Sequence, residues 1–126
     1  MTQEDKELLL KDLCAKLPYG VRVLLSDEDV ETLNLIEWNK IIQDWYIRAG
    51  IYIGVSLDII KPYLRSMSSM TEEEKDEYDN IVYGITNIGS KYEYYDLVDW
   101  LNKKMFDYRG LIDKGLALEA PEGMYK

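Results

Sequence analysis

The spacing of apolar residues changes at Pro18, and this change restricts the fold of the chain more than any other feature of its sequence. Before the proline, apolar side chains recur every three or four residues, as they do on one face of a helix. They are Leu9, Leu10, Leu13, Cys14 and Leu17. After the proline, Val21, Val23 and Leu25 occupy alternate positions, which is the period of a strand. A helical period followed by a strand period indicates an α+β fold.

The first segment carries further helix signals. Thr2 and Asp5 have the spacing of a capping box, in a weaker form with Asp in place of Glu. Pro18 is expected to end the helix because it cannot continue the backbone hydrogen bonding. Since Cys14 shares the predicted apolar face, we expect its thiol to be buried and slow to react.

A strand is predicted after an acidic turn. Residues 26–31 are mostly acidic and indicate a solvated turn. Leu33 and Leu35 then alternate, but the next apolar residue, Ile36, has the other parity. A shift of one residue within a strand predicts a β-bulge.

Residues 36–48 fit two kinds of structure. Their apolar residues have the spacing of a helix face, whereas their β-branched and aromatic content favours a strand. We predict a strand and keep a helix as the alternative. Residues 49–50, Ala-Gly, then predict a tight turn, and Ile51, Ile53 and Val55 alternate in the clearest strand pattern of the chain.

Pro62 argues against a central strand within residues 57–65, because proline lacks the amide hydrogen that a ladder needs. Thr71 and Glu74 form a second capping box, which predicts a helix that ends at or near Gly84. The inner face of this helix is predicted to hold Tyr78, Ile81 and Val82.

A third capping box, Ser90 with Glu93, predicts another helix. Its inward face is predicted to hold Tyr94, Val98, Leu101 and Met105, with Leu97 and Trp100 beside them. A short helical turn over residues 108–114 is expected to follow, with Gly115 in the position of a terminating glycine.

The last residues leave two interpretations open. Leu116 and Leu118 alternate, which predicts a short extended segment packed against the body of the protein. Beyond Pro121 the chain is either a loose end, or it is held by Tyr125 in a groove of its own body or of a second copy.

The length of 126 residues suits one domain, over residues 1–126. We expect an α+β domain with an N-terminal helix, a small antiparallel sheet or partial β-barrel, and two to three C-terminal helices. The apolar runs are far shorter than the ~20 residues that span a bilayer. The acidic start "MTQEDKELLL" has no export signal, so we expect a cytoplasmic protein without a membrane partner.

The net charge of −9 is concentrated in two segments. Residues 26–45 and residues 71–80 each hold six acids and one base. A protein that binds nucleic acid directly needs clustered Lys and Arg, and the chain has no such cluster. We therefore expect no direct binding of nucleic acid.

The chain has no histidine and one cysteine. This composition excludes a Ser-His-Asp triad and makes a structural zinc site or an iron–sulfur cluster within one chain untenable. A calcium loop starting at Asp27 fails because Thr32 and Trp38 occupy the positions that need Gly and Glu. We expect no cofactor, no metal and no catalytic residues, and we lean against an enzyme.

The aromatic residues are eleven Tyr and three Trp against one Phe. Tyr and Trp are enriched at protein interfaces because they join an apolar ring to a polar tip. The segment "YEYYDLVDW" has more rings than one inner face can hold, so we expect some of them to be exposed. We interpret six residues as a candidate interaction surface: Asp27, Glu28, Asp29, Tyr92, Tyr95 and Tyr125.

Three stretches resemble a family of short proteins of gut bacteria and their phages or prophages. They are "LLLKDLCAKLPYGV", "IKPYLRSMSSMTEEE" and "FDYRGLIDKGLALEAPEGMYK". The resemblance covers about half of the chain and implies cargo of a mobile element, but no catalytic residue, cofactor or substrate. Members of the family differ most in the part that corresponds to residues 26–58, which favours short strands there.

These observations lead us to expect a non-enzymatic protein-interaction or accessory protein of phage or prophage origin, with an unidentified protein partner. Two alternatives remain. One is an acidic mimic of nucleic acid that occupies a nucleic-acid-binding protein of the host. The other is an enzyme that uses carboxylates and tyrosines.

Overall fold

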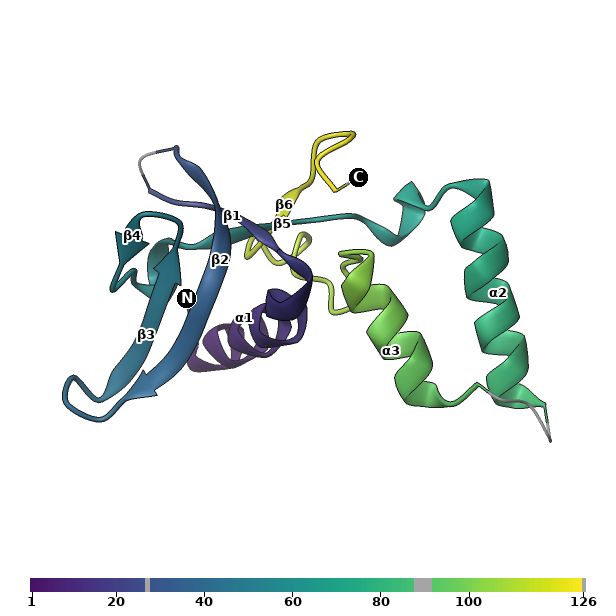
Figure 1. Ribbon diagram of the computed structural model, residues 1–126, viewed down its shortest axis with the longest axis horizontal. Helices are drawn as coiled ribbons and strands as arrows, with labels where there is room; N and C mark the ends of the chain where they lie inside the picture. The colour runs from purple at the N-terminus through teal and green to yellow at the C-terminus, as the bar shows by residue number, and fades with distance from the viewer. Residues whose placement is uncertain (27, 88–91, 126) are drawn as a thin grey trace.

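The computed structural model describes residues 1–26, 28–87 and 92–125, and it confirms the α+β class (Figure 1). The helices are α1 (Gln3–Lys16), α2 (Glu72–Thr86) and α3 (Tyr94–Lys103). The strands are β1 (Arg22–Leu24), β2 (Val30–Asn39), β3 (Asp44–Ala49), β4 (Tyr52–Ile53), β5 (Lys61–Leu64) and β6 (Leu118–Glu119). Short 3₁₀ turns lie at Leu17–Tyr19, Leu57–Ile59 and Met67–Ser69.

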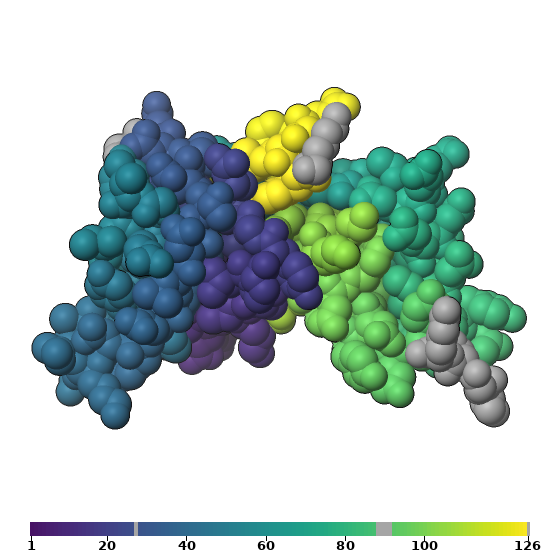
Figure 2. All heavy atoms as spheres, in the orientation of Figure 1, coloured from purple at the N-terminus to yellow at the C-terminus, as the bar shows by residue number. Residues whose placement is uncertain are grey.

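The strands form one sheet in the order β4-β3-β2-β1-β5-β6. Neighbouring strands are antiparallel except for β5 and β6, which are parallel, so the sheet is mixed rather than antiparallel throughout. Helix α1 packs on the sheet, whereas α2 and α3 form a helical pair at the other end of an elongated molecule (Figures 1 and 2). Strands β5 and β6 and the C-terminal tail lie between the two ends (Figure 1).

Helix α1 begins as predicted, but its buried face differs from the prediction. Thr2 Oγ1 accepts from Asp5 N at 3.0 Å, and Asp5 Oδ2 accepts from Thr2 N at 3.3 Å, which confirms the capping box. Cys14 is exposed, so the prediction of a buried thiol is wrong. The reason is that the buried stripe runs through two charged positions beside the leucines: Leu9, Asp12, Leu13 and Lys16.

Strands β1, β2 and β3 confirm the alternation in the first half of the chain. Val21, Val23 and Leu25 are all buried. In β2, Leu33 pairs with Ala49 and Leu35 with Arg48, which confirms the predicted bulge. Most of residues 36–48 lies in β2 and β3, so the strand interpretation of this segment is confirmed and the helical alternative is wrong.

The segment with the clearest strand pattern forms only the two-residue β4. The turn at residues 49–50 is present, and Gly50 has a φ of 59°. Ile51 lies in the turn and is 84% exposed, and Ile53 pairs with Arg48 and is 67% exposed, whereas Val55 is buried. The alternation therefore does not mark a buried face, because the chain reaches the core only at Val55.

Strand β5 contradicts the expectation from Pro62, because it lies between β1 and β6 in the sheet. Ala120 N donates to Leu64 O, so the main-chain groups of Leu64 face β6. Pro62 lies two residues earlier in the same strand, so its main-chain groups face the same side. The pairing with β6 begins only opposite Tyr63. The fold tolerates the missing amide hydrogen of Pro62 because the proline nitrogen lies on the β6 side of the strand, one residue before the pairing with β6 begins.

Helix α2 begins with the predicted capping box of Thr71 and Glu74. It continues to Thr86, two residues beyond Gly84, so Gly84 is a buried residue of the last turn and not a terminator. Of the predicted inner face, Ile81 is buried, and Tyr78 and Val82 are half-buried.

Helix α3 starts later than predicted. Ser90 lies outside the described residues, and the residue that precedes the helix is Glu93, whose N–H donates to Asp96 Oδ2 at 2.7 Å. Tyr94 is therefore the first helical residue and is 71% exposed, so its assignment to the inward face is wrong. Leu101 and Met105 are buried as predicted.

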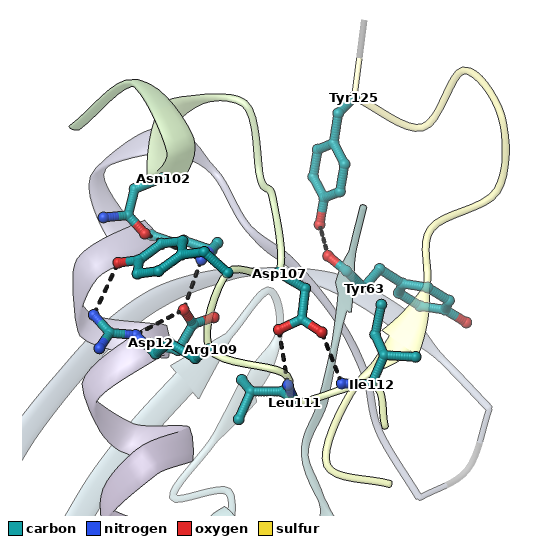
Figure 3. A network of polar contacts seen from close by, with 10 residues as sticks. Asp12, Tyr63, Asn102, Asp107, Arg109, Leu111, Ile112 and Tyr125 are labelled. Carbon is teal, nitrogen blue, oxygen red and sulfur yellow. Dashed lines mark hydrogen bonds and ion pairs between the residues drawn. The ribbon is translucent and has the colours of Figure 1, made fainter. Parts of the chain in front are cut away.

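Residues 108–114 form consecutive turns and no helix. Asp107 holds them by accepting from Leu111 N at 2.8 Å and from Ile112 N at 2.9 Å (Figure 3). Gly115 N donates to Ile112 O, Leu116 N donates to Leu111 O, and Gly115 has a φ of 74°. This is the hydrogen-bond pattern of a helix terminus, so the role predicted for Gly115 is confirmed although only a turn precedes it.

The C-terminal tail is held on the body of the protein by Tyr125 (Figure 3). The Tyr125 hydroxyl donates to Tyr63 O at 2.7 Å and accepts from Arg22 N at 2.8 Å. Of the two interpretations of the tail, the structure thus supports docking on its own chain over a loose end. Burial raises the pKa of Tyr125 to about 12.

Candidate protein-interaction surface

The β2–β3 hairpin ends in a group of apolar side chains, three of which are exposed to solvent. We call this group the hairpin tip, and it consists of Trp38, Ile41 and Ile42, which are exposed, and of Trp45, which is half-buried against the core. Ile41 is 92% exposed, Ile42 59% and Trp38 51%. The tip projects from the end of the molecule opposite α2 and α3 (Figures 1 and 2).

The loop that carries the two isoleucines is held by a side chain of β2. Asn39 Oδ1 accepts from Ile41 N at 2.9 Å and from Ile42 N at 3.2 Å, which is a local turn that Asn favours. Gln43 closes the loop with a φ of 52°. The loop thus has a defined backbone, and it presents two aliphatic side chains outside the core.

The two tryptophans of the tip form a cross-strand pair. Trp38 and Trp45 lie opposite each other in the register of β2 and β3. Their ring centroids are 5.5 Å apart and the rings are inclined at 76°, the edge-to-face arrangement that aromatic rings favour. This contact joins the two strands next to the exposed loop, and Trp45 also packs against the core.

A groove of about 260 Å³ lies beside the tryptophan pair. Its other walls come from the first half of α1 and from the turn at Leu57–Ile59. The lining residues are Gln3, Lys6, Glu7, Leu10, Trp38, Gln43, Asp44, Trp45, Ser56, Leu57 and Asp58. Lys6 Nζ lies 3.4 Å from Asp58 Oδ1, and both side chains are largely exposed. The groove therefore joins an apolar part, made by the tryptophans and two leucines, to a charged rim.

The structure does not bring the six residues predicted from the sequence together. Asp27 lies outside the described residues. Glu28 and Asp29 are exposed in the loop between β1 and β2, where Asp29 accepts a hydrogen bond from the Tyr52 hydroxyl. Tyr125 belongs to the tail, and its hydroxyl lies between Arg22 of β1 and Tyr63 of β5.

The remaining two predicted residues lie at the α2–α3 end. Tyr92 lines a groove between α2 and α3 together with Glu77, Asp96 and Trp100. Tyr95 is exposed, and the neighbouring Glu93 is the main cause that raises its pKa. The expectation of exposed rings in this segment is thus met, but these rings are far from the acidic loop (Figure 1).

Sequence reasoning missed the hairpin tip. It read the apolar residues of 36–48 only as evidence for a strand or a helix and did not ask whether they were exposed. One signal could have pointed to exposure: Ile41 and Ile42 stand between Lys40 and Gln43, at the centre of a segment that must turn if both flanks are strands.

A buried cluster of charged groups has a structural role. Lys16 Nζ lies 2.6 Å from Asp12 Oδ1 and donates to Asn102 Oδ1 at 3.0 Å, and Arg109 Nε donates to Asp12 Oδ1 at 3.2 Å (Figure 3). The cluster joins α1 to α3 and to the turns after it. Asp12 and Lys16 are fully buried, which closes them to a substrate, and this burial lowers the pKa of Lys16.

A second ion pair holds α2 to the segment after β5. Arg65 donates two hydrogen bonds to the carboxylate of Glu74, at 2.6 and 2.7 Å, and its guanidinium lies 4.3 Å from the centre of the Phe106 ring. The bond with Arg65 is the main cause that lowers the pKa of Glu74 to about 2. A groove of about 420 Å³ lies beside this pair and the tail, but its strongest charges are already neutralised by each other.

Within the described ranges, no three Cys, His, Asp or Glu side chains gather as a metal site requires, and no helix is long and apolar enough to cross a membrane. Comparison of the chain with protein-family models, with curated proteins and with solved structures gives no match.

Proposed function

We propose that this chain is a non-enzymatic interaction protein that binds a protein partner through the hairpin tip. From the sequence resemblance and the composition, we further propose that it is an accessory protein of phage or prophage origin that acts in the cytoplasm.

One observation carries the proposal: a hairpin loop with a defined backbone holds Ile41 and Ile42 in solvent next to Trp38. Burial of such a side chain contributes about 1.5–3 kcal/mol, and here the fold does not use that contribution. Contiguous exposed apolar side chains on a folded protein are typical of interaction sites, and aromatic residues are common at the centre of such sites.

The arrangement of charge gives less support to a nucleic-acid mimic. A mimic needs its acidic groups in one continuous stripe. The two acidic segments lie at opposite ends of the molecule: the described residues of 26–45 lie in β2, the start of β3 and the loops beside them, and residues 72–80 lie in α2 (Figure 1).

The geometry also gives less support to an enzyme. The carboxylates with the closest charged partners are Asp12, which is fully buried, and Glu74, which is held by Arg65. Neither stands free in a groove where it would meet a substrate.

Affinity capture with matched variants tests the proposal. The wild-type chain, an Ile41→Ser/Ile42→Ser variant and a Tyr83→Ser/Tyr94→Ser control are used as bait in the native cells. The control removes two exposed side chains at the opposite end, Tyr83 at 70% and Tyr94 at 71%, against 92% and 59% for Ile41 and Ile42. Partners retained by the wild type and the control but lost with the hairpin variant support the proposal, provided that a purified partner then binds directly. Identical partners for all three baits contradict it.

A further inference from the structure

The groove beside Trp38 and Trp45 restricts the kind of partner that fits the hairpin tip. Its volume of about 260 Å³ is below the ~300–1,000 Å³ of typical small-molecule sites. It is open, and its apolar walls come from Trp38, Trp45, Leu10 and Leu57. A groove of this size and lining suits a single large apolar side chain that anchors a protein segment.

The rim of the groove carries an excess of negative charge. Glu7, Asp44 and Asp58 line it, against the single base Lys6. Lys6 pairs with Asp58 at 3.4 Å, so the carboxylates of Glu7 and Asp44 carry the excess negative charge of the rim. A bound segment therefore gains from positive charge next to its apolar anchor and loses from negative charge there.

The same charges disfavour a second copy of the chain as the occupant. Two copies that met through this groove would bring two negative rims together, each on a chain of net charge −9. Like charges placed against each other across an interface oppose association.

We propose that the groove binds a basic segment of a partner protein, in which a large apolar side chain is flanked by Lys or Arg. This inference rests on the proposed function, because it names the partner chemistry of the same site. The apolar anchor lies against the tryptophan pair, and the flanking cations lie against Glu7 and Asp44.

Two synthetic peptides serve as probes. They share the same leucine positions, and their remaining positions are Lys in one and Glu in the other. Binding of each labelled peptide to the full chain is measured by fluorescence anisotropy at low and high salt. We expect the Lys peptide to bind about tenfold or more tightly than the Glu peptide, with a difference that shrinks as salt screens the rim.

Charge variants separate the groove from the net charge of the protein. Glu7→Gln/Asp44→Asn should weaken binding of the Lys peptide about fivefold or more. A control, Glu72→Gln/Glu73→Gln, removes the same charge from the far end and should change binding less than about twofold. Equal losses in the two double variants would mean that the peptide responds to overall charge, which overturns the proposal.

Other outcomes distinguish this inference from the function on which it rests. If both peptides bind equally and Trp38→Ala abolishes both, the tip is a docking site but the partner is not selected by charge. If neither peptide binds while capture still depends on Ile41 and Ile42, the basic segment is wrong and the proposed function stands. If light scattering shows a dimer that Ile41→Ser/Ile42→Ser dissociates, the occupant is a second copy, which also overturns the inference.

Discussion

Replacing Tyr125 by phenylalanine removes the hydroxyl group that lies where the direct main-chain pairing of β1 and β5 ends. Strands β1 and β5 pair at Val23 with Pro62 and at Leu24 with Lys61. The next pair in this register is Arg22 with Tyr63. There the Tyr125 hydroxyl stands between the strands, accepting from Arg22 N at 2.8 Å and donating to Tyr63 O at 2.7 Å. A side chain from the tail thus completes a ladder between strands far from it in sequence.

The size of the loss follows from the two main-chain groups that lose their partner. Leaving a buried donor or acceptor without a hydrogen bond costs about 1–3 kcal/mol. Both groups are only partly buried here, so water replaces some of the loss. We expect Tyr125→Phe to lower the free energy of unfolding by about 1.5–3 kcal/mol in total, a large part of the ~5–15 kcal/mol typical of a domain.

Urea unfolding measures this loss. With a slope of about 1–3 kcal/mol/M, a loss of 2 kcal/mol lowers the midpoint by about 1 M while the slope stays the same. Tyr83→Phe is the matched control, because it removes the hydroxyl of an exposed ring and should leave the midpoint unchanged. A Tyr125→Phe midpoint equal to that of the wild type would refute the bridging role of the hydroxyl and favour the interpretation of the tail as a loose end.

The dependence of the free energy of unfolding on alkaline pH gives an independent check on the Tyr125 hydroxyl. The pKa of Tyr125 rises from 10.0 to about 12 on folding, so the protonated form is the one that the fold stabilises. Its contribution is complete below pH 10 and is lost as the pH rises from 10 to 12. The wild type should therefore lose more stability than Tyr125→Phe over this range, and parallel curves would contradict this assignment.

Three further predictions concern α1 and the ion pairs. Asp12→Ala leaves Lys16 without its carboxylate partner inside the protein and should cost about 3–5 kcal/mol in urea unfolding, whereas a loss below about 1 kcal/mol would mean that water reaches the site. Glu74→Gln should reduce the loss of stability on acidification, because the lowered pKa of Glu74 contributes stability above pH 4.5 that is lost as the pH falls toward 2. If the free energy of unfolding falls with pH equally in wild type and variant, the pair with Arg65 adds no stability. Cys14 should react with a thiol reagent at most about tenfold more slowly in the native protein than in denaturant, because its side chain is exposed although partial burial raises the pKa of the thiol. Protection by several orders of magnitude would instead support the buried position that the sequence suggested.

Elements set by neighbouring residues were predicted well from the sequence. The capping boxes at Thr2 and Thr71 need only a partner three residues away, so their signal is complete in a short stretch. The bulge after Leu33 was visible as a change of parity. The same holds for Gly115, whose hydrogen bonds lie within one turn.

Features set by distant residues were not predicted. Lys16 pairs with Asp12 on its own helix, but its second buried partner, Asn102, lies 86 residues away. Pro62 is accepted in a central strand because β6 starts one residue beyond it, and β6 comes from the far end of the chain. Tyr125 docks on main-chain groups 62 and 103 residues before it, so only the possibility of docking was open to sequence reasoning.

The candidate site was misplaced for a related reason. Charge and ring counts selected Glu28, Asp29, Tyr92, Tyr95 and Tyr125, which the fold distributes over several elements. The hairpin tip was passed over because periodicity assumes that spaced apolar residues are buried. Whether such residues face a core depends on what packs against them, and Ile41 and Ile42 lie in the loop, where they are 92% and 59% exposed.

Site-specific photocrosslinking tests the interaction role of the hairpin tip most directly. A photoreactive amino acid is placed at position 41 in one variant and at position 83 in another, since Ile41 and Tyr83 are both exposed and lie at opposite ends of the molecule. Illumination of native cells should give one discrete crosslinked product from position 41 and none of that mass from position 83. The same product from both positions, or a product from position 83 alone, would contradict a partner-binding role for the hairpin tip.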